Sequence, residues 1–537
     1  MQQMTTAQAT VETLLRHGID TVYAVPGVHN DHLFDALYHA SNRIRVIHAR
    51  HEQTAGYMAM GAALATGRPQ VLAVVPGPGL LNAGAALLTA HAAGAPVIAL
   101  VGQIRQAHID RGYGNLHELH DQLGILRSLT KFCARISAPF EAPELVDEAI
   151  HQACSGRTRP TALECAIDVW GLKGAVALIE PRPRSLPPVD DSAVDLAVRL
   201  LSASKRPLIV VGSGAQDAAA EVLALAERLE APVVAYRRGQ GVLPGTHRLS
   251  VPVPIGHRLW RETDAVLGIG TRLFTQQESW GVDRDLKILR IDADPQEPDR
   301  LRKADCAMLG DAAATLRVLL DRLPPEPRAS RADELAGHRA WLAQRLAGLE
   351  PQLGFLRAMR AALPADGILV DEVTQMGFAS RVAFPVLRPR SYISTYQDNL
   401  GYGYGTALGV KAACPERAVL SIAGDGGFAY QGMELATAVR HRLGVVVVVF
   451  DDGKFGNVQR IQATQFGNRL IACDLANPDF VRFAESFGVA AFRAQSAAEL
   501  ETALRRAFDL GAPALVHVPV GDMPSVWDLI RLPRVRG

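Results

Sequence analysis

Short apolar runs, each long enough for one buried strand, recur along the chain with helical patterns between them. They include residues 71–75 and 97–101 in the first third, and residues 419–423 and 445–450 in the last, where five consecutive valines precede a phenylalanine. Runs that are apolar throughout are typical of strands buried on both faces of a parallel sheet. Their alternation with helical segments predicts an α/β protein whose parallel sheets are flanked by helices and joined by right-handed crossovers.

Two proline-rich stretches, residues 180–188 and 323–328, interrupt this alternation. Such stretches are typical of linkers between domains. A chain of 537 residues is also long enough for about three domains of ordinary size. We therefore predict three domains, which comprise residues 1–172, 190–323 and 345–537.

Composition narrows the classes of partner and compartment. Lys and Arg number 56 and Asp and Glu 55, without a basic arm, so a nucleic-acid partner is not expected. The N-terminus has neither a basic segment nor an apolar core, and the apolar runs are far shorter than the ~20 residues of a membrane span. The six cysteines show no metal-ligand spacing. We expect a cytoplasmic protein without membrane contact.

The candidate chemistry lies where two of the predicted strands end. Gly424-Asp425-Gly426 follows the strand 419–423, and its glycines allow a sharp turn whose N–H groups approach a phosphate. The 24 residues 427–450 then lead to Asp451 and Asp452 at the end of the next strand. Mg²⁺ is bound in proteins through a few carboxylates together with phosphate oxygens. Asp425 and Asp452 therefore predict a metal site beside a diphosphate.

This spacing resembles the diphosphate motif of the thiamine diphosphate (ThDP) enzymes, in which Gly-Asp-Gly is followed, after a spacer in the mid-twenties, by Asn-Asn or Asn-Asp. The resemblance implies ThDP and Mg²⁺ as cofactors. The metal would be held by Asp425, Asp452 and the backbone carbonyl of Lys454. The first residue of the final pair departs from the family, because Asp451 stands there and adds negative charge near a diphosphate.

A second resemblance covers residues 51–59 and the Gly-Pro-Gly turn at 77–79, which are similar to the glutamate motif of the acetolactate synthase-like branch of this family. It implies that Glu52 hydrogen-bonds N1′ of the cofactor's aminopyrimidine and promotes loss of the C2 proton. Ala, Gly and Met neighbours predict that Glu52 is buried. The alternative is a surface glutamate that caps a helix.

Further cofactor contacts follow from the resemblance, which extends over nearly the whole chain. Leu400 would wedge between the two rings of the cofactor and hold them in a bent conformation; the alternative is an ordinary core leucine. The full set of implied cofactor-binding residues is Pro26, Gly27, Glu52, Thr374, Asp398, Leu400, Gly424, Asp425, Gly426, Gly427 and Asp452.

Three other residues fall where the family places substrate-facing groups, namely His29, His117 and Glu118. Histidines titrate near neutrality and relay protons. The resemblance therefore implies catalytic roles beside Glu52. The alternative for each histidine is a surface position or a core imidazole with satisfied hydrogen bonds.

The central segment carries Gly212 and Gly214 after an apolar run, as dinucleotide-binding turns do, but Asp217 occupies the place of the third glycine. We interpret this domain as structural and FAD as not expected. An ADP-like or flavin ligand is the alternative.

The resemblance to the acetolactate synthase-like and benzaldehyde lyase-like branch implies a pyrimidine-binding, a central and a diphosphate-binding domain. It implies a ThDP- and Mg²⁺-dependent decarboxylase or carboligase acting on 2-oxo acids. One alternative is a C–C lyase on aldehyde-derived substrates, of the benzaldehyde lyase or 2-hydroxyacyl-CoA and oxalyl-CoA decarboxylase type. Another is a catalytically silent protein of the same fold. The resemblance also implies a homodimer or homotetramer with active sites at subunit interfaces.

Substrate size is the last expectation. Acetolactate synthases carry a Trp after the metal-binding loop that narrows the site, and Ile461 takes its place here. The resemblance thus implies a wider pocket lined by polar groups, including Asn457 and Gln459. Such a pocket favours a 2-oxo acid larger or more polar than pyruvate.

Overall fold

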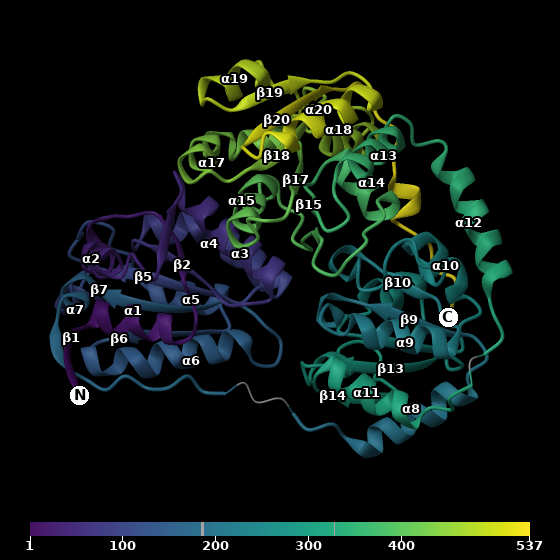
Figure 1. Cartoon of the computed structure of the whole chain (residues 1–537), viewed down its shortest axis with the longest axis horizontal. Coiled ribbons are helices and arrows are strands. Elements are labelled where there is room, and N and C mark those ends of the chain that lie inside the picture. Colours follow the sequence, from purple (N-terminus) through teal and green to yellow (C-terminus); the bar gives the residue numbers. More distant parts are fainter. Residues whose placement is uncertain (184–186, 327) are drawn as a thin grey trace.

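The computed structural model describes residues 1–183, 187–326 and 328–537. Three six-stranded parallel sheets, each flanked by helices, form three domains, and the third domain lies across the other two (Figure 1). The predicted α/β architecture of three parallel-sheet domains is confirmed. Of the two predicted linkers, residues 184–186 and 327 lie outside the described residues.

The first domain has the strand order β3-β2-β4-β5-β7-β6, with an antiparallel pair, β1 and β8, beside it. Its strands are β1 (Gln2–Thr5), β2 (Thr21–Ala24), β3 (Arg45–His48), β4 (Gln70–Val74), β5 (Val97–Gln103), β6 (Phe132–Ile136), β7 (Thr161–Ala166) and β8 (Lys173–Val176). Its helices are α1 (Thr6–Arg16), α2 (Asp31–His39), α3 (Glu52–Thr66), α4 (Pro78–Ala93), α5 (Gln122–Leu129), α6 (Ala142–Cys154) and α7 (Ile167–Trp170).

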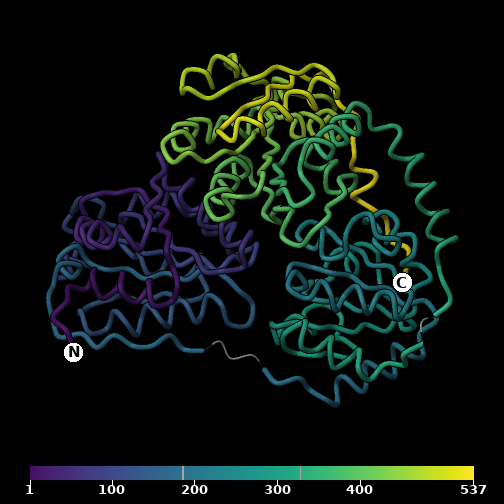
Figure 2. The backbone as a smooth tube through the Cα atoms, viewed as in Figure 1, coloured from purple at the N-terminus to yellow at the C-terminus, as the bar shows by residue number. Residues whose placement is uncertain are grey.

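The central domain has the order β11-β10-β9-β12-β13-β14. Its strands are β9 (Pro207–Val211), β10 (Val233–Ala235), β11 (Ser250–Val251), β12 (Ala265–Ile269), β13 (Lys287–Asp292) and β14 (Cys306–Leu309), and its helices are α8 (Asp191–Ala203), α9 (Ala219–Leu229), α10 (Val253–Trp260) and α11 (Ala312–Arg322). Helix α12 (Ala332–Leu346) leads onward to the third domain. The C-terminal end of the chain returns to the central domain (Figure 2), where the backbone N–H of Val535 donates to the carbonyl of Trp280 at 2.9 Å.

The third domain has the order β16-β15-β17-β18-β20-β19. Its strands are β15 (Ile368–Val370), β16 (Tyr392–Ile393), β17 (Val419–Gly424), β18 (Val445–Asp451), β19 (Ala490–Arg493) and β20 (Ala514–Pro519). Its helices are α13 (Gln352–Ala362), α14 (Gln375–Ala383), α15 (Gly403–Ala413), α16 (Asp425–Ala429), α17 (Leu435–His441), α18 (Gly456–Gln465), α19 (Phe480–Ser486) and α20 (Ala497–Asp509). Of the predicted apolar runs, residues 419–423 and 445–450 form β17 and β18 at the centre of this sheet.

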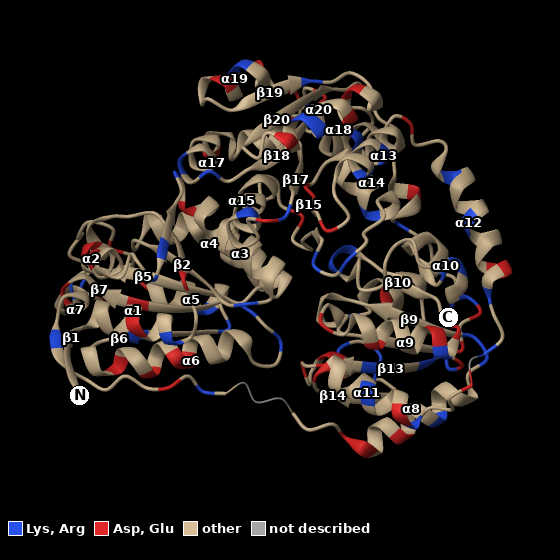
Figure 3. Ribbon diagram, in the orientation of Figure 1, with Lys and Arg blue, Asp and Glu red and all other residues tan. Residues whose placement is uncertain are grey.

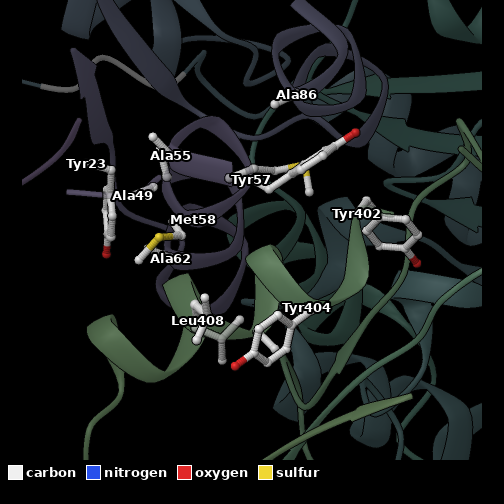
Figure 4. Packing of buried hydrophobic residues seen from close by; sticks show 14 of the residues in the cluster. Tyr23, Ala49, Ala55, Tyr57, Met58, Ala62, Ala86, Tyr402, Tyr404 and Leu408 are labelled. Carbon is white, nitrogen blue, oxygen red and sulfur yellow. The ribbon is translucent and has the colours of Figure 1, made fainter. Parts of the chain in front are cut away.

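Helices α3 and α15 join the first and third domains through one hydrophobic core, which includes Tyr57, Met58, Tyr404 and Leu408 (Figure 4). Their backbones touch, since a Cβ added to Gly409 would lie 1.9 Å from the carbonyl oxygen of Met58. Only glycine permits this approach. The packing fixes how the glutamate motif, at the start of α3, is placed against the third domain.

A cavity of about 780 Å³ lies where the three domains meet. The carboxyl ends of β9 and β12, with Gly212, Gly214 and Gly270, form one wall, and Tyr236 and Tyr396 contribute aromatic rings. The central domain therefore lines a cavity with space for a ligand, and its interpretation as purely structural stays a prediction.

Charged residues of both signs are interspersed over all three domains (Figure 3), in keeping with the near-neutral balance of the sequence. Over the described ranges, every helix is too short or too polar to cross a bilayer.

Candidate active site

The Gly-Asp-Gly turn and the Asp-Asp pair meet at one edge of the third sheet. Strands β17 and β18 pair in parallel with Gly424 opposite Phe450, so Asp425, which follows β17, and Asp451, the last residue of β18, lie at the same end of the sheet. One carboxylate oxygen of Asp425 accepts the backbone N–H of Gly453 at 3.0 Å and the side-chain amide of Asn477 at 2.6 Å. The structure thus brings both halves of the predicted motif together.

Asp425 and Asp452 form a negatively charged, partly desolvated pair. Burial, together with the nearby Asp425 carboxylate, raises the pKa of Asp452 to about 6. Burial also raises the pKa of Asp425. The Lys454 ammonium is held by an ion pair with Asp522. Two carboxylates that resist ionisation beside one another suit a divalent cation with oxygen ligands, so these residues fit Mg²⁺.

The turn around Asp425 packs so closely against neighbouring side chains that its glycines leave no space for side chains of their own. A Cβ added to Gly426 would lie 2.6 Å from the ring of Phe455, and one added to Gly424 would lie 3.0 Å from the methyl group of Thr374. Thr374 begins α14 as its N-cap, and its hydroxyl accepts the N–H of Gly377 at 2.8 Å. The hydroxyl keeps its own proton to donate to an oxygen ligand. This glycine turn together with the Thr374 hydroxyl, here called the glycine cradle, therefore fits phosphate oxygens.

The predicted wedge loop, residues 398–403, is held by charges from two domains. The carboxylate of Asp398 pairs with Arg381 at 2.9 Å and with Arg237 of the central domain at 2.7 Å. Leu400, two residues after Asp398, is partly buried, and Gly401 adopts a positive φ of 78°. The role of Leu400 as the wedge stays a prediction.

Glu372 is a residue of this site that sequence reasoning missed. It is 1% exposed, and its two carboxylate oxygens accept the backbone N–H of Gly401 at 3.1 Å and of Gly403 at 2.9 Å. A Cβ added to Gly427 would lie 3.3 Å from its carboxyl carbon. Burial raises the pKa of Glu372 to about 7. Glu372 thus links the wedge loop to the Gly-Asp-Gly turn. Its position just after β15, at the ligand-binding end of a parallel strand, was the available signal.

We expect that Glu372→Ala lowers ThDP affinity about tenfold or more, because two buried N–H groups lose their acceptor. Glu372→Gln retains one acceptor oxygen but turns its amide NH₂ toward the second backbone N–H. Its ThDP affinity should fall between that of the wild type and that of the alanine variant. Calorimetric titration with ThDP measures both. Glu416→Gln, at an exposed position of the same domain, is the matched control. Unchanged affinity in the alanine variant would contradict this role.

Glu52 is the first residue of α3, and its carboxylate accepts the side-chain amide of Asn82 at 3.0 Å. The predicted burial of Glu52 is wrong for the single chain, where this side chain is partly exposed. The apolar neighbours lie further along α3, whereas Glu52 stands at its open end. His51 is the N-cap of the helix, since its ring accepts the N–H of Gln53 at 3.1 Å. His51 rather than Glu52 therefore caps the helix, and the Glu52 carboxylate is not used for capping.

The two predicted histidines stack on one another, with ring centroids 5.0 Å apart and an interplanar angle of 24°. His29 is buried, and its Nε2 lies 3.1 Å from the carbonyl oxygen of Leu116. Burial and the neighbouring His117 lower the pKa of His29. The carbonyl of His117 lies 2.5 Å from a Cβ added to Gly77, at the turn that also borders Glu52. The histidine pair and Glu52 therefore share one turn of the first domain.

The other predicted site residues of the first domain, Glu118 and Gly27, contact different parts of it. Glu118 turns back on its own loop, where its carboxylate accepts the backbone N–H of Asn115 at 2.7 Å. Gly27, after Pro26, packs against Val75, two residues before the Gly-Pro-Gly turn, since an added Cβ would lie 2.6 Å from its side chain. Among the described residues, the side-chain hydrogen bond of Glu52 runs to Asn82, while Asp425 bonds Asn477 and Gly453. The half of the candidate site on the first domain, with Glu52, and the half on the third, with Asp425, are joined nearby by hydrogen bonds, since the backbone N–H of His51 donates to the Glu434 carboxylate at 3.0 Å.

Family profiles match all three domains. The profile described as "Thiamine pyrophosphate enzyme, N-terminal TPP binding domain" matches residues 4–125, the central-domain profile residues 194–319, and the C-terminal TPP binding domain profile residues 372–518. The chain belongs to the thiamine pyrophosphate enzymes, and thiamine pyrophosphate is another name for ThDP.

Over nearly its whole length, the chain is similar to proteins that are named for two different activities. The chain is 33% identical over 536 residues to the probable 2-ketoarginine decarboxylase AruI of Pseudomonas aeruginosa, with 96% of this chain and 94% of that protein covered. It is 30% identical over 573 residues to the acetolactate synthase large subunit of Corynebacterium glutamicum, covering 98% of this chain and 89% of the relative. The acetolactate synthase of Bacillus subtilis is 28% identical over 542 residues. The protein is an acetolactate synthase-like, ThDP-dependent lyase or transferase, and the catalytically silent alternative is not favoured.

Proposed function

We propose that the protein is a ThDP- and Mg²⁺-dependent decarboxylase or carboligase acting on a 2-oxo acid with a long or polar side chain. The observation that carries the cofactor assignment is the pairing of Asp425 with Asp452 at the ends of β17 and β18, beside a glycine cradle. The similarity to a relative named as a 2-ketoarginine decarboxylase supports decarboxylation of such a substrate.

In this proposal each half-site has its own task. Asp425, Asp452 and the carbonyl of Lys454 hold the metal, and Thr374 with the glycine turn binds phosphate oxygens. The chemistry that bound ThDP supplies is a nucleophilic carbon and a sink for the electrons left when CO₂ departs.

Other residues orient the cofactor and handle protons. Leu400 and Asp398 keep the cofactor's rings bent, while Glu52 holds and returns a proton at N1′. His29 and His117 donate or accept protons at the substrate's oxygen, and the stacked pair helps to exclude water from the reacting carbon.

A second copy of the chain completes the site in this proposal, as a homodimer or homotetramer. Large apolar side chains are exposed around both half-sites: Val28, Leu81 and Leu116 in the first domain, and Tyr430 and Met433 in the third. Helix α18, which follows the metal-binding loop, buries none of its residues within the single chain. These surfaces support contact with a partner, since isolated proteins rarely expose such clusters without a function.

The substrate panel is the test of this function. We expect pyruvate to be a poorer donor than longer or functionalised 2-oxo acids, including one with a guanidino group, because Ile461 in place of Trp leaves a wider, polar pocket. CO₂ release and acyloin products are measured for each donor. Acetolactate formed from pyruvate faster than any other product would contradict the proposal.

The same substrates are also given to the variant His117→Ala. We expect this substitution to lower turnover more than ThDP affinity. His120→Ala, on the same loop and exposed, is the matched control. An aldehyde product released from a 2-hydroxy ketone, without CO₂, would instead favour the C–C lyase alternative.

The absence of FAD stays a prediction. It rests on Asp217 at the place of the third glycine. The interdomain cavity of about 780 Å³ has room for a nucleotide-sized ligand. The visible absorbance of the purified protein is therefore a direct test.

A further inference from the structure

Asp451, the residue at which the chain departs from the family motif, is surrounded by hydrogen-bond donors. One carboxylate oxygen accepts the side-chain amide of Asn477 at 2.9 Å and the backbone N–H of Gly453 at 3.2 Å. The other lies 3.0 Å from Nε2 of His517. Because an ionised carboxylate only accepts hydrogen bonds, His517 donates from Nε2 whether the ring is neutral or charged.

His517 is held in a position that serves this contact. It lies on β20 opposite Val449 of β18, two residues before Asp451. Its ring is 5% exposed and packs edge to face on Phe480 with centroids 5.4 Å apart. Its Nδ1 is buried without a hydrogen-bond partner among the described residues. The contact with Asp451 is thus the polar role that the described surroundings give this ring.

Asn477 connects Asp451 to the metal site itself. Its side-chain amide lies within hydrogen-bonding distance of Asp451, at 2.9 Å, and of Asp425, at 2.6 Å. A single amide therefore sits between the unusual carboxylate and a proposed metal ligand. Displacement of Asp451 would move Asn477 and, through it, Asp425.

We propose that His517 and Asn477 are positioning residues that offset the charge of Asp451 and hold Asp425 in the orientation that binds the metal. Without their donors, Asp451 would face Asp425, Asp452 and a diphosphate as an uncompensated negative charge. Where asparagine occupies this position the charge does not arise. His517 is therefore needed because Asp451 is present. This inference rests on the proposed Mg²⁺ and ThDP site.

The alternative is that His517 merely fills space beneath the site. A double-mutant comparison separates the two roles, because a residue that compensates a charge becomes dispensable when the charge is removed. His517→Phe keeps an aromatic ring for Phe480 but removes the donor. His517→Gln keeps a donor and is the conservative variant. Asp451→Asn removes the charge.

The experiment measures Mg²⁺-dependent ThDP binding by calorimetry with the full-length protein, and thermal unfolding reports folding. We expect His517→Phe to weaken binding about tenfold or more, and His517→Gln, Asp451→Asn and the double variant Asp451→Asn with His517→Phe to bind within about threefold of the wild type. Equal binding by wild type and His517→Phe would overturn the inference, as would a double variant as weak as His517→Phe.

If His517→Phe does not fold, the double variant must still fold and bind within about threefold of the wild type, and its failure overturns the inference. If the wild type binds no ThDP in the presence of Mg²⁺, the proposed function fails and the inference with it. Normal wild-type binding with no loss in His517→Phe removes the inference alone.

Discussion

Replacing Glu52 by glutamine is expected to stop activation of the cofactor almost completely while leaving ThDP binding within about threefold of the wild type. The amide fills the same space but cannot cycle a proton with N1′. Loss of the C2 proton should then become very slow. Deuterium exchange at C2, followed by NMR after acid quench, measures this step, and exchange at the wild-type rate would show that Glu52 is not the activator.

A mixing control tests where Glu52 acts. Glu52→Gln and Asp452→Ala should each be inactive alone. If Glu52 of one copy serves the metal site of another, co-expressed variants should regain about a quarter of the wild-type activity, because half of the random dimers are mixed and each carries one complete site. The absence of any recovery, with mixed dimers demonstrated, would place Glu52 and Asp452 of one chain in the same site.

Loss of the Asp452 carboxylate is expected to abolish metal-dependent ThDP binding. Asp452→Ala removes one of two carboxylates from the proposed ligand set, whereas the diphosphate alone faces negative charge without compensation. Calorimetry with ThDP, with and without Mg²⁺, measures the effect. Asp451→Asn is the matched control and should bind nearly normally. Equal ThDP affinity of the wild type with and without metal would refute the site.

A fall in pH should weaken metal binding, as the loss of the Asp452 carboxylate does. Burial and Asp425 raise the pKa of Asp452 to about 6, so protons compete with the metal as the pH falls through that value. Metal affinity should therefore be highest above pH 6 and decrease below it. A metal affinity that stays the same between about pH 7 and about pH 5 would contradict this coupling.

The positions of several strands along the chain could be predicted from the sequence because buried parallel strands carry apolar side chains on both faces. Residues 419–423 and 445–450 form β17 and β18 as expected, and the glycine turn between them leaves the sheet at its carboxyl end. The predicted burial of Glu52 was wrong because it was inferred from the neighbours of Glu52 along the sequence. Apolar neighbours along a helix report on the helix as a whole, whereas exposure of its first residue depends on what lies beyond its end.

The sequence by itself determined that the chain has parallel α/β domains and that Asp425 and Asp452 lie near one another, because strand pattern and spacing are local properties of the chain. Only the tertiary structure decided which distant residues serve these carboxylates. Glu372 reaches the wedge loop from the end of β15, and His517 reaches Asp451 from β20. The interdomain cavity likewise depends on three domains meeting. These contacts join residues tens or hundreds of positions apart, and a side chain acquires such a role only when folding places it there.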